Sequence, residues 1–130
     1  MILIDTHMWI WWIHDDPRLT ARQREILEQH ETDDLAASIM SCWEVAKLVE
    51  RHRLVLPEPV DRWLELALGY PGVQMLPLTP EIAVESTRLP GSFHRDPVDQ
   101  ILVASARICR CPILTADQQI LGYAHVERCA

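Results

Sequence analysis

The chain has 130 residues, of which 48% are hydrophobic and 24% charged, a balance typical of one globular domain rather than a disordered segment. Its net charge of −7, from 12 basic and 19 acidic residues, excludes a protein that holds nucleic acid through a bulk positive field. No apolar stretch approaches the roughly 20 residues of a membrane helix, and the first residues lack a basic leader, so we expect no signal peptide and a cytoplasmic protein.

Strand-like and helix-like patterns alternate from the start of the chain. Residues 2–4 and 35–39 are short apolar runs that predict buried strands. Residues 6–13 predict a helix rich in Trp and Ile, and residues 20–30 predict a polar helix whose N-cap is Thr20.

The middle of the chain predicts two more helices. Ser41 has the character of an N-cap, and Glu44 follows at the spacing of a capping box, so we expect a helix to begin there. Residues 60–69 predict a second, amphipathic helix.

The second half continues the alternation. Thr79-Pro80 and Asp96-Pro97 each combine an N-cap with a following proline, and they predict helices that reach Leu89 and Ile108. The second of these helices is apolar on nearly all sides, so we expect it to be buried. The remaining predicted elements are strands at 73–78, 112–114 and 125–128 and a helical turn at 118–123. This order is typical of an α/β fold with a small, mainly parallel sheet flanked by helices, and residues 1–130 read as a single domain.

Acidic residues fall where predicted strands end and helices begin. Asp5 ends the first strand and Asp117 follows the fourth. Glu44, Asp96 and Asp99 lie in the first turns of predicted helices. Because ligands of parallel α/β sheets bind outside the carboxyl ends of the strands, we expect these carboxylates to share one cleft.

Clustered carboxylates repel one another unless a cation lies between them. Mg²⁺ and Mn²⁺ prefer oxygen ligands, and such an ion can activate water and stabilise charge on a phosphoryl group. Local structural roles stay open for four of the acids: Asp96 and Asp117 as N-caps, Glu44 in the capping box, and Asp99 as a partner of the helix dipole. For Asp5 we expect no local structural role.

Four blocks of the sequence together resemble the PIN domain and, within that family, VapC-type toxins of toxin–antitoxin systems. The blocks are residues 4–7 with Trp11-Trp12, residues 41–48, Leu89-Pro90 with residues 94–104, and residues 114–117. The resemblance covers nearly the whole chain and implies a Mg²⁺- or Mn²⁺-dependent endoribonuclease, the toxin of a type II system, that hydrolyses RNA phosphodiester bonds.

The resemblance also implies roles for single residues. Asp5, Glu44, Asp99 and Asp117 match the acidic quartet of the family, with Asp5 and Asp99 as the main metal ligands. Asp96 belongs to the Asp-Pro element of this subgroup and stays open as an outer-shell residue.

Hydroxyl groups and cations lie beside the acids. The hydroxyls of Thr6 and Thr115 could hold ligand waters or a phosphate, or could make ordinary capping bonds. Arg95 could contact RNA or pair with a neighbouring acid. Three cations on or after the Glu44 helix, Lys47, Arg51 and Arg53, read as a solvated face.

The resemblance implies two protein partners, a VapB-type antitoxin that blocks the acidic cleft and a second copy of the chain. Most of the tryptophans are expected in the core, because Trp carries a large apolar surface. Five tryptophans against one phenylalanine nevertheless suggest that some indoles form an exposed patch for such a partner, and Trp9 and Trp12 share a predicted helix face.

Two other functions remain open from the sequence: a catalytically silent PIN-fold binding module and a DNA-directed nuclease. A dinucleotide enzyme is disfavoured because no G-x-G-x-x-G follows the first strand, and a serine hydrolase because no G-x-S-x-G is present.

Overall fold

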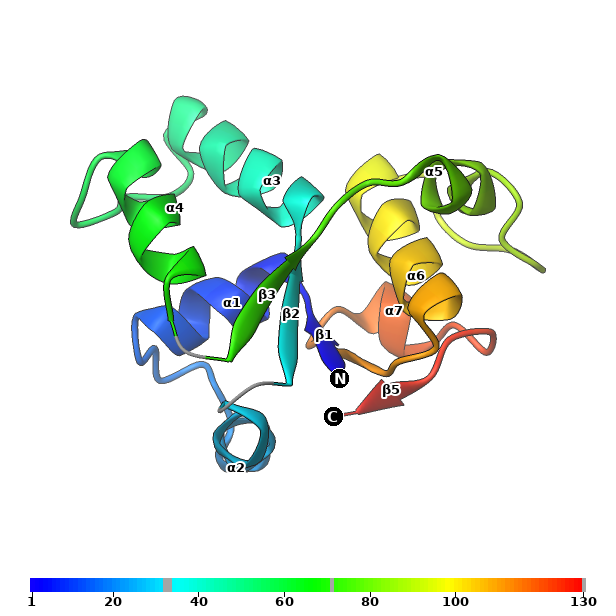
Figure 1. Ribbon diagram of the computed structural model, residues 1–130, viewed down its shortest axis with the longest axis horizontal. Helices are drawn as coiled ribbons and strands as arrows, with labels where there is room; N and C mark the ends of the chain where they lie inside the picture. Colours follow the sequence, from blue (N-terminus) through cyan, green and yellow to red (C-terminus); the bar gives the residue numbers. More distant parts are fainter. Residues whose placement is uncertain (32–33, 71, 130) are drawn as a thin grey trace.

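A computed structural model of the protein describes residues 1–31, 34–70 and 72–129. Five strands form one sheet in the order β3-β2-β1-β4-β5, and every pairing between neighbours is parallel (Figure 1). The strands are β1 (Ile2–Ile4), β2 (Leu35–Ser38), β3 (Val73–Leu76), β4 (Ile113–Leu114) and β5 (Arg128–Cys129). The helices are α1 (Thr6–Ile13), α2 (Ala21–His30), α3 (Ile39–Glu50), α4 (Val60–Leu68), α5 (Pro80–Ser86), α6 (Pro97–Cys109) and α7 (Gln118–Leu121). The predicted α/β class with a parallel sheet is confirmed.

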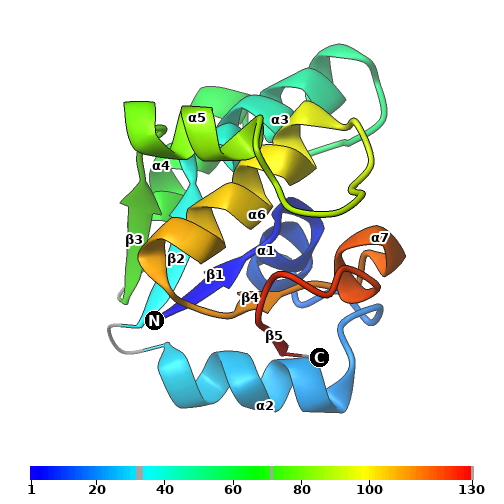
Figure 2. The same ribbon diagram turned by 90° about the vertical axis from the view of Figure 1, so that its right-hand side faces the viewer.

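Helices cover both faces of the sheet because side chains alternate along each strand. Ile2 and Ile4 of β1 pack into a core with α1, α2, α3 and α4, whereas Leu3 between them packs into a second core with α6 and α7. Figures 1 and 2 show the strands between these two groups of helices. Among the described residues, no helix combines the length and apolar character needed to cross a membrane.

The start of α3 differs from the prediction. Ser38, not Ser41, is the N-cap: its hydroxyl accepts a hydrogen bond from the Met40 amide at 3.0 Å, and the helix begins at Ile39. Ser41 is therefore inside the helix and fully buried, and its Oγ accepts a hydrogen bond from the Thr6 hydroxyl at 2.9 Å. The capping-box interpretation of Glu44 is wrong, because Glu44 lies in the second turn of α3.

Several element ends also differ from the prediction. The strands are shorter than expected at β2, β3 and β4, and β5 lies at 128–129 rather than 125–128. The helix after Thr79 ends at Ser86 and does not reach Leu89. At its end the Thr87 hydroxyl donates a hydrogen bond to the Val84 carbonyl oxygen at 2.7 Å. These ends are set by local hydrogen bonds that the apolar pattern does not encode.

The tryptophans are mostly core residues. Trp9 is 0% exposed and packs edge-to-face on Trp63 at 5.3 Å between ring centroids. Trp12 is partly buried and packs near Tyr70. Trp9 therefore cannot contact a partner in the folded state, and that part of the expectation is wrong. The tryptophan that does face solvent is Trp43, which is 48% exposed.

Candidate active site

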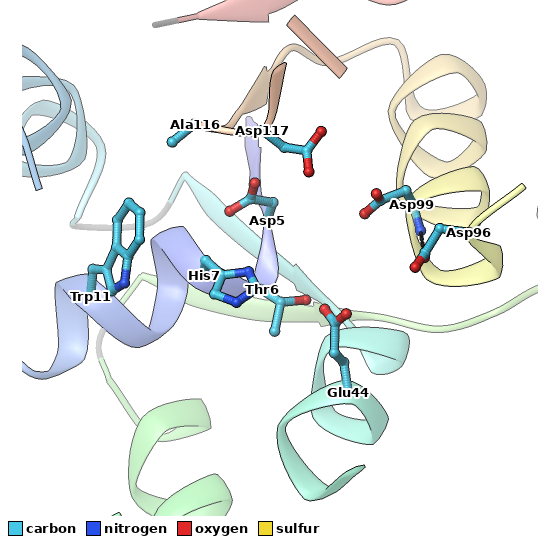
Figure 3. A pocket seen from close by; sticks show the side chains of 9 residues that line it. All are labelled: Asp5, Thr6, His7, Trp11, Glu44, Asp96, Asp99, Ala116 and Asp117. Carbon is cyan, nitrogen blue, oxygen red and sulfur yellow. Dashed lines mark hydrogen bonds between the residues drawn. The ribbon is translucent and has the colours of Figure 1, made fainter. Parts of the chain in front are cut away.

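A cleft with a volume of about 350 Å³ opens at the carboxyl edge of the sheet. All five acids singled out in the sequence line it, and they come from the ends of β1 and β4 and from α3 and α6 (Figure 3). The lining residues are Asp5, Thr6, His7, Trp11, Glu44, Asp96, Asp99, Ala116 and Asp117. The predicted gathering of carboxylates at one edge is thus what the fold produces.

Asp5 is buried at the end of β1 and is held from two sides. Its Oδ1 accepts a hydrogen bond from the Met8 amide at 2.8 Å, so Asp5 is the N-cap of α1. Its Oδ2 accepts a hydrogen bond from the hydroxyl of Thr115. Burial raises the pKa of Asp5 above its ordinary value, and this effect outweighs the lowering by these two bonds. The expectation that Asp5 has no local structural role is wrong.

Thr115 links Asp5 to Asp117. Its side chain is fully buried, and its Oγ1 also accepts a hydrogen bond from the Asp117 amide at 2.9 Å. Asp117 in turn caps α7, with Oδ1 accepting from the amides of Gln119 at 2.8 Å and Ile120 at 3.2 Å. Thr115 therefore positions both acids from below the cleft rather than lining it.

Asp96 and Asp99 divide their roles at the start of α6. Oδ1 of Asp96 accepts a hydrogen bond from the Asp99 amide at 3.0 Å, which makes Asp96 the N-cap. The carboxylate of Asp99 faces the other acids in Figure 3.

The pKa of Asp99 is raised to about 7, first by burial and then by repulsion from its acidic neighbours, in descending order Asp96, Asp117, Glu44 and Asp5. Burial and the neighbouring acids thus oppose the negative charge of Asp99. A bound cation would relieve this repulsion.

Glu44 projects toward the cleft from the second turn of α3 (Figure 3). Within residues 1–31, 34–70 and 72–129, its carboxylate has neither a hydrogen bond nor an ion pair. The neighbouring Thr6 hydroxyl is already engaged by donating to Ser41. Glu44 is therefore the cleft acid with both carboxylate oxygens available.

His94 is a site residue that the sequence analysis missed. Its Nε2 lies 3.0 Å from Oδ2 of Asp99, in a close contact that is not aligned as a hydrogen bond. Ligand atoms of His94, Asp99 and Asp117 all lie within 4.8 Å of one another, so these three side chains could hold one metal ion. The Gln100 side chain donates to the His94 carbonyl oxygen at 3.1 Å and steadies the loop. The position of His94, two residues before a helix cap that borders the acids, was the available signal.

An aromatic rim on α1 was missed as well. His7 and Trp11 line the cleft one helical turn apart, with ring centroids separated by 6.2 Å. The guanidinium of Arg18 lies 5.1 Å from the Trp11 ring centroid. The i, i+4 spacing of His7 and Trp11, shortly after Asp5, could have predicted this rim.

Arg95 is exposed and does not line the cleft. In the part of the chain that the structure describes, it forms no ion pair with Asp96 or Asp99, so the salt-bridge alternative is not present here. Its contact with RNA stays a prediction.

Comparison with known proteins agrees with this geometry. Residues 2–126 match the PIN domain family. The chain is 31% identical over 124 residues to Ribonuclease VapC22 of Mycobacterium tuberculosis (strain ATCC 25618 / H37Rv), covering 95% of this chain and 92% of the relative.

Solved structures share the fold. The DNA-bound VapBC of Salmonella typhimurium has a TM-score of 0.73 at 14% identity, with 98% of this chain and 95% of that chain covered. The sarcin-ricin-loop-cleaving toxin VapC20 of Mycobacterium tuberculosis has a TM-score of 0.62 at 15% identity, with 98% and 99% covered. The family match, the relative and the acidic cleft together lead to one conclusion: the chain belongs to the PIN-domain family, among its VapC-type members.

Proposed function

We propose that the protein is a divalent-metal-dependent endoribonuclease, the toxin of a type II toxin–antitoxin system, which hydrolyses phosphodiester bonds of RNA. The observation that carries this proposal is the convergence of Asp5, Glu44, Asp99 and Asp117 on one cleft. The 31% identity to a protein named as a ribonuclease supports the nuclease reading over a silent binding module.

The donor set fits Mg²⁺ or Mn²⁺. Both ions favour carboxylate oxygens. Burial and repulsion from the neighbouring acids raise the pKa of Asp99, and a bound cation would offset that repulsion. Asp5 and Asp99 would be the main ligands, with Glu44 and Asp117 completing the site directly or through water. When bound, the metal supplies activation of water and stabilisation of negative charge on the phosphoryl group.

The chain's own contribution is to hold the acids in place. Asp5 is fixed by the Met8 amide and the Thr115 hydroxyl, and Asp117 is fixed through its bonds at the start of α7. Such rigid positioning lowers the reorganisation that the reaction requires. Glu44, which keeps both oxygens available, is placed to orient the attacking water and accept its proton.

Asp96 serves α6 as its cap and stands at the outer edge of the same cleft, as an outer-shell residue. Thr115 acts on the site through its hydrogen bond to Asp5, and Thr6 lines the cleft itself as an outer-shell residue. We assign Arg95 a secondary contact with RNA at the rim, because it is exposed next to the acids.

We further propose a VapB-type antitoxin whose tail blocks the acidic cleft, and self-association into a homodimer. Several solved structures with this fold are toxin–antitoxin complexes, including one from Klebsiella pneumoniae. A cationic antitoxin side chain would form a charge-assisted contact with the unpaired acids. A cytoplasmic location follows from an RNA substrate in this proposal.

The test is cleavage by the purified chain, freed of any partner, of total RNA and of matched single-stranded DNA. Each reaction is run with Mg²⁺, with Mn²⁺ and with chelator, beside Asp5→Asn and Asp99→Asn, which keep the side-chain volume. Asp61→Asn, an exposed acid on α4, is the matched control. Discrete RNA cuts that vanish with chelator and with either cleft variant are expected. Cleavage of DNA alone would make the protein a DNA nuclease, and intact RNA without metal binding would leave a binding module.

A further inference from the structure

A second groove adjoins the acid cleft on the side of α3. Its volume is about 350 Å³, and it shares Glu44 and Asp96 with the cleft, so the two hollows adjoin at these side chains. The groove runs between the solvent side of α3 and the beginning of α6, which lie side by side in Figure 1. A polymer lying across the acids would therefore pass into it.

The groove contains an exposed indole. Trp43 lines the groove with 48% of its surface exposed. It lines the groove together with Glu44, so a flat group on its ring would lie next to the acid site. Large exposed aromatics without a burial role are typical of binding surfaces.

Cations surround this indole. The Lys47 Nζ lies 5.8 Å from the Trp43 ring centroid and pairs with Glu50 at 2.9 Å. Arg51 and Arg53 also line the groove, and neither lies within salt-bridge distance of an acid that the structure describes, but Arg51 is near enough to Glu50 to help lower the pKa of that carboxyl. With Lys47, these two guanidinium groups outnumber the two acids that line the groove, Glu44 and Asp96, so in a chain of net charge −7 the groove is a local site for anions.

The turn after α3 places both arginines in the groove. The Arg53 amide donates to the Leu48 carbonyl oxygen at 2.8 Å, and the His52 amide donates to that of Val49 at 3.1 Å. These two bonds form a Schellman motif, with His52 at the left-handed position (φ 57°) where glycine is usual. The motif turns the chain back along the helix end, so that Arg51 and Arg53 both line the groove.

The opposite rim of the cleft lacks this charge. Arg18 lies over Trp11, but its Nε and Nη2 bind the carboxylate of Asp16 at 3.0 and 2.8 Å. The Trp11 rim therefore offers an aromatic face with one neutralised cation, whereas the Trp43 groove offers an aromatic face with two arginines that no acid binds at salt-bridge distance.

We propose that the Trp43 groove is a subsite for one nucleotide of single-stranded RNA next to the cleaved bond, with the base stacked on Trp43 and backbone phosphate against Arg51 and Arg53. The subsite rests on the proposed ribonuclease function. Stacking on an exposed ring requires an unstacked base, which single strands and loops supply and duplexes do not. Base stacking is tolerant of sequence, so the groove contributes affinity and strand type rather than base identity.

The test measures binding apart from cleavage. A short fluorescein-labelled single-stranded oligoribonucleotide of mixed sequence is titrated with the full chain in chelator, and anisotropy gives the dissociation constant. Trp43→Ala should weaken binding by roughly tenfold, and Trp43→Phe should retain most of it because a ring remains. Arg51→Ala combined with Arg53→Ala should weaken binding and flatten its dependence on KCl concentration. Arg62→Ala, which removes an exposed cation paired with Glu65 on α4, is the control.

The outcomes separate the subsite from the catalytic proposal. Unchanged RNA affinity in Trp43→Ala, with a thermal unfolding curve like that of the parent chain, would overturn the subsite even if RNA cleavage is seen. Equal affinity for the annealed duplex would overturn its single-strand character. If Trp43→Ala lost a co-purifying protein partner but kept its RNA affinity, the groove would be reassigned to that partner. Trp43-dependent binding without cleavage under any metal would retain the subsite and reject the nuclease.

Discussion

Asp99 is the cleft acid whose charged form is opposed first by burial and then by the neighbouring carboxylates. Its pKa is raised to about 7 from an ordinary value of 3.8, so between these pH values the folded protein binds a proton that the unfolded chain releases. The contribution of Asp99 to stability is therefore most favourable at low pH and is lost as pH rises through about 7. Burial also raises the pKa of Asp5, so its contribution to stability falls in the same way as pH rises.

We predict that Asp99→Asn makes the metal-free protein more stable than the parent chain above neutral pH and that this difference shrinks as the medium becomes acidic. The amide cannot ionise, so the variant lacks the penalty that grows with pH. Urea unfolding in chelator at a series of pH values measures the difference. The free energy of unfolding of Asp61→Asn should vary with pH as that of the parent chain does. A constant difference between Asp99→Asn and the parent at every pH would contradict the raised pKa of Asp99.

His94 is predicted to support the metal site through its contact with Asp99. Removing a side chain that orients a metal ligand commonly lowers metal affinity by roughly tenfold or more. We therefore expect His94→Ala to weaken Mn²⁺ binding by about tenfold, as measured by calorimetry. The exposed His125→Ala, outside the cleft, should bind Mn²⁺ as the parent does, and equal affinity in His94→Ala would remove His94 from the site.

Helix starts deliver the acids to the cleft. Asp5, Asp96 and Asp117 are the N-caps of α1, α6 and α7. From the sequence, capping and metal binding were competing explanations for Asp96 and Asp117, but a carboxylate has two oxygens and about four acceptor positions. A cap can therefore anchor one side of the group while the other side faces the cleft.

The capping role of Asp96 predicts a pair of variants with different stability. Asp96→Ala removes the acceptor for the Asp99 amide and should lower the free energy of unfolding by about 1 kcal/mol. Asp96→Ser should restore most of this, because a hydroxyl also accepts that bond. Urea unfolding of both variants in chelator measures the contrast, and equal stability of the two would show that the cap contributes little.

The whole molecule is organised around β1, which contributes to the cores on both faces of the sheet. Leu3 packs with α6 and α7, whereas Ile4 packs with α1 and the other helices of the opposite face. Because Asp5 follows directly, loss of packing on either face would also displace the site.

This arrangement predicts that residues 1–130 unfold as one domain. Leu3→Ala should cost about 2–5 kcal/mol through the cavity it leaves, on the face opposite to most of the tryptophans, since Trp9, Trp11, Trp12 and Trp63 lie in or against the other core. We expect indole fluorescence and far-ultraviolet circular dichroism to shift together in urea. If fluorescence kept the transition of the parent while circular dichroism shifted, the two faces would be separate cooperative units.

The sequence by itself determined the alternation of strands and helices, the parallel sheet and the gathering of five acids at its carboxyl edge. These follow from short apolar runs, proline-containing caps and the rule that parallel strands end at one edge, and all of that information is local. The N-cap at Asp96 was also among the local roles that the sequence offered, whereas the place of Asp99 in the acidic quartet was implied only by the family resemblance.

Only the tertiary structure decided which residues support the acids and which lie beside them. Ser41 lies inside α3, which Ser38 caps, and its hydroxyl accepts a hydrogen bond from Thr6, a residue 35 positions away. Thr115 holds Asp5 across 110 positions, and His94 reaches Asp99 from a loop without periodicity. Trp43 and the two arginines form a groove because a left-handed residue turns the chain after α3. Such contacts depend on how distant segments are packed, which neither composition nor spacing encodes.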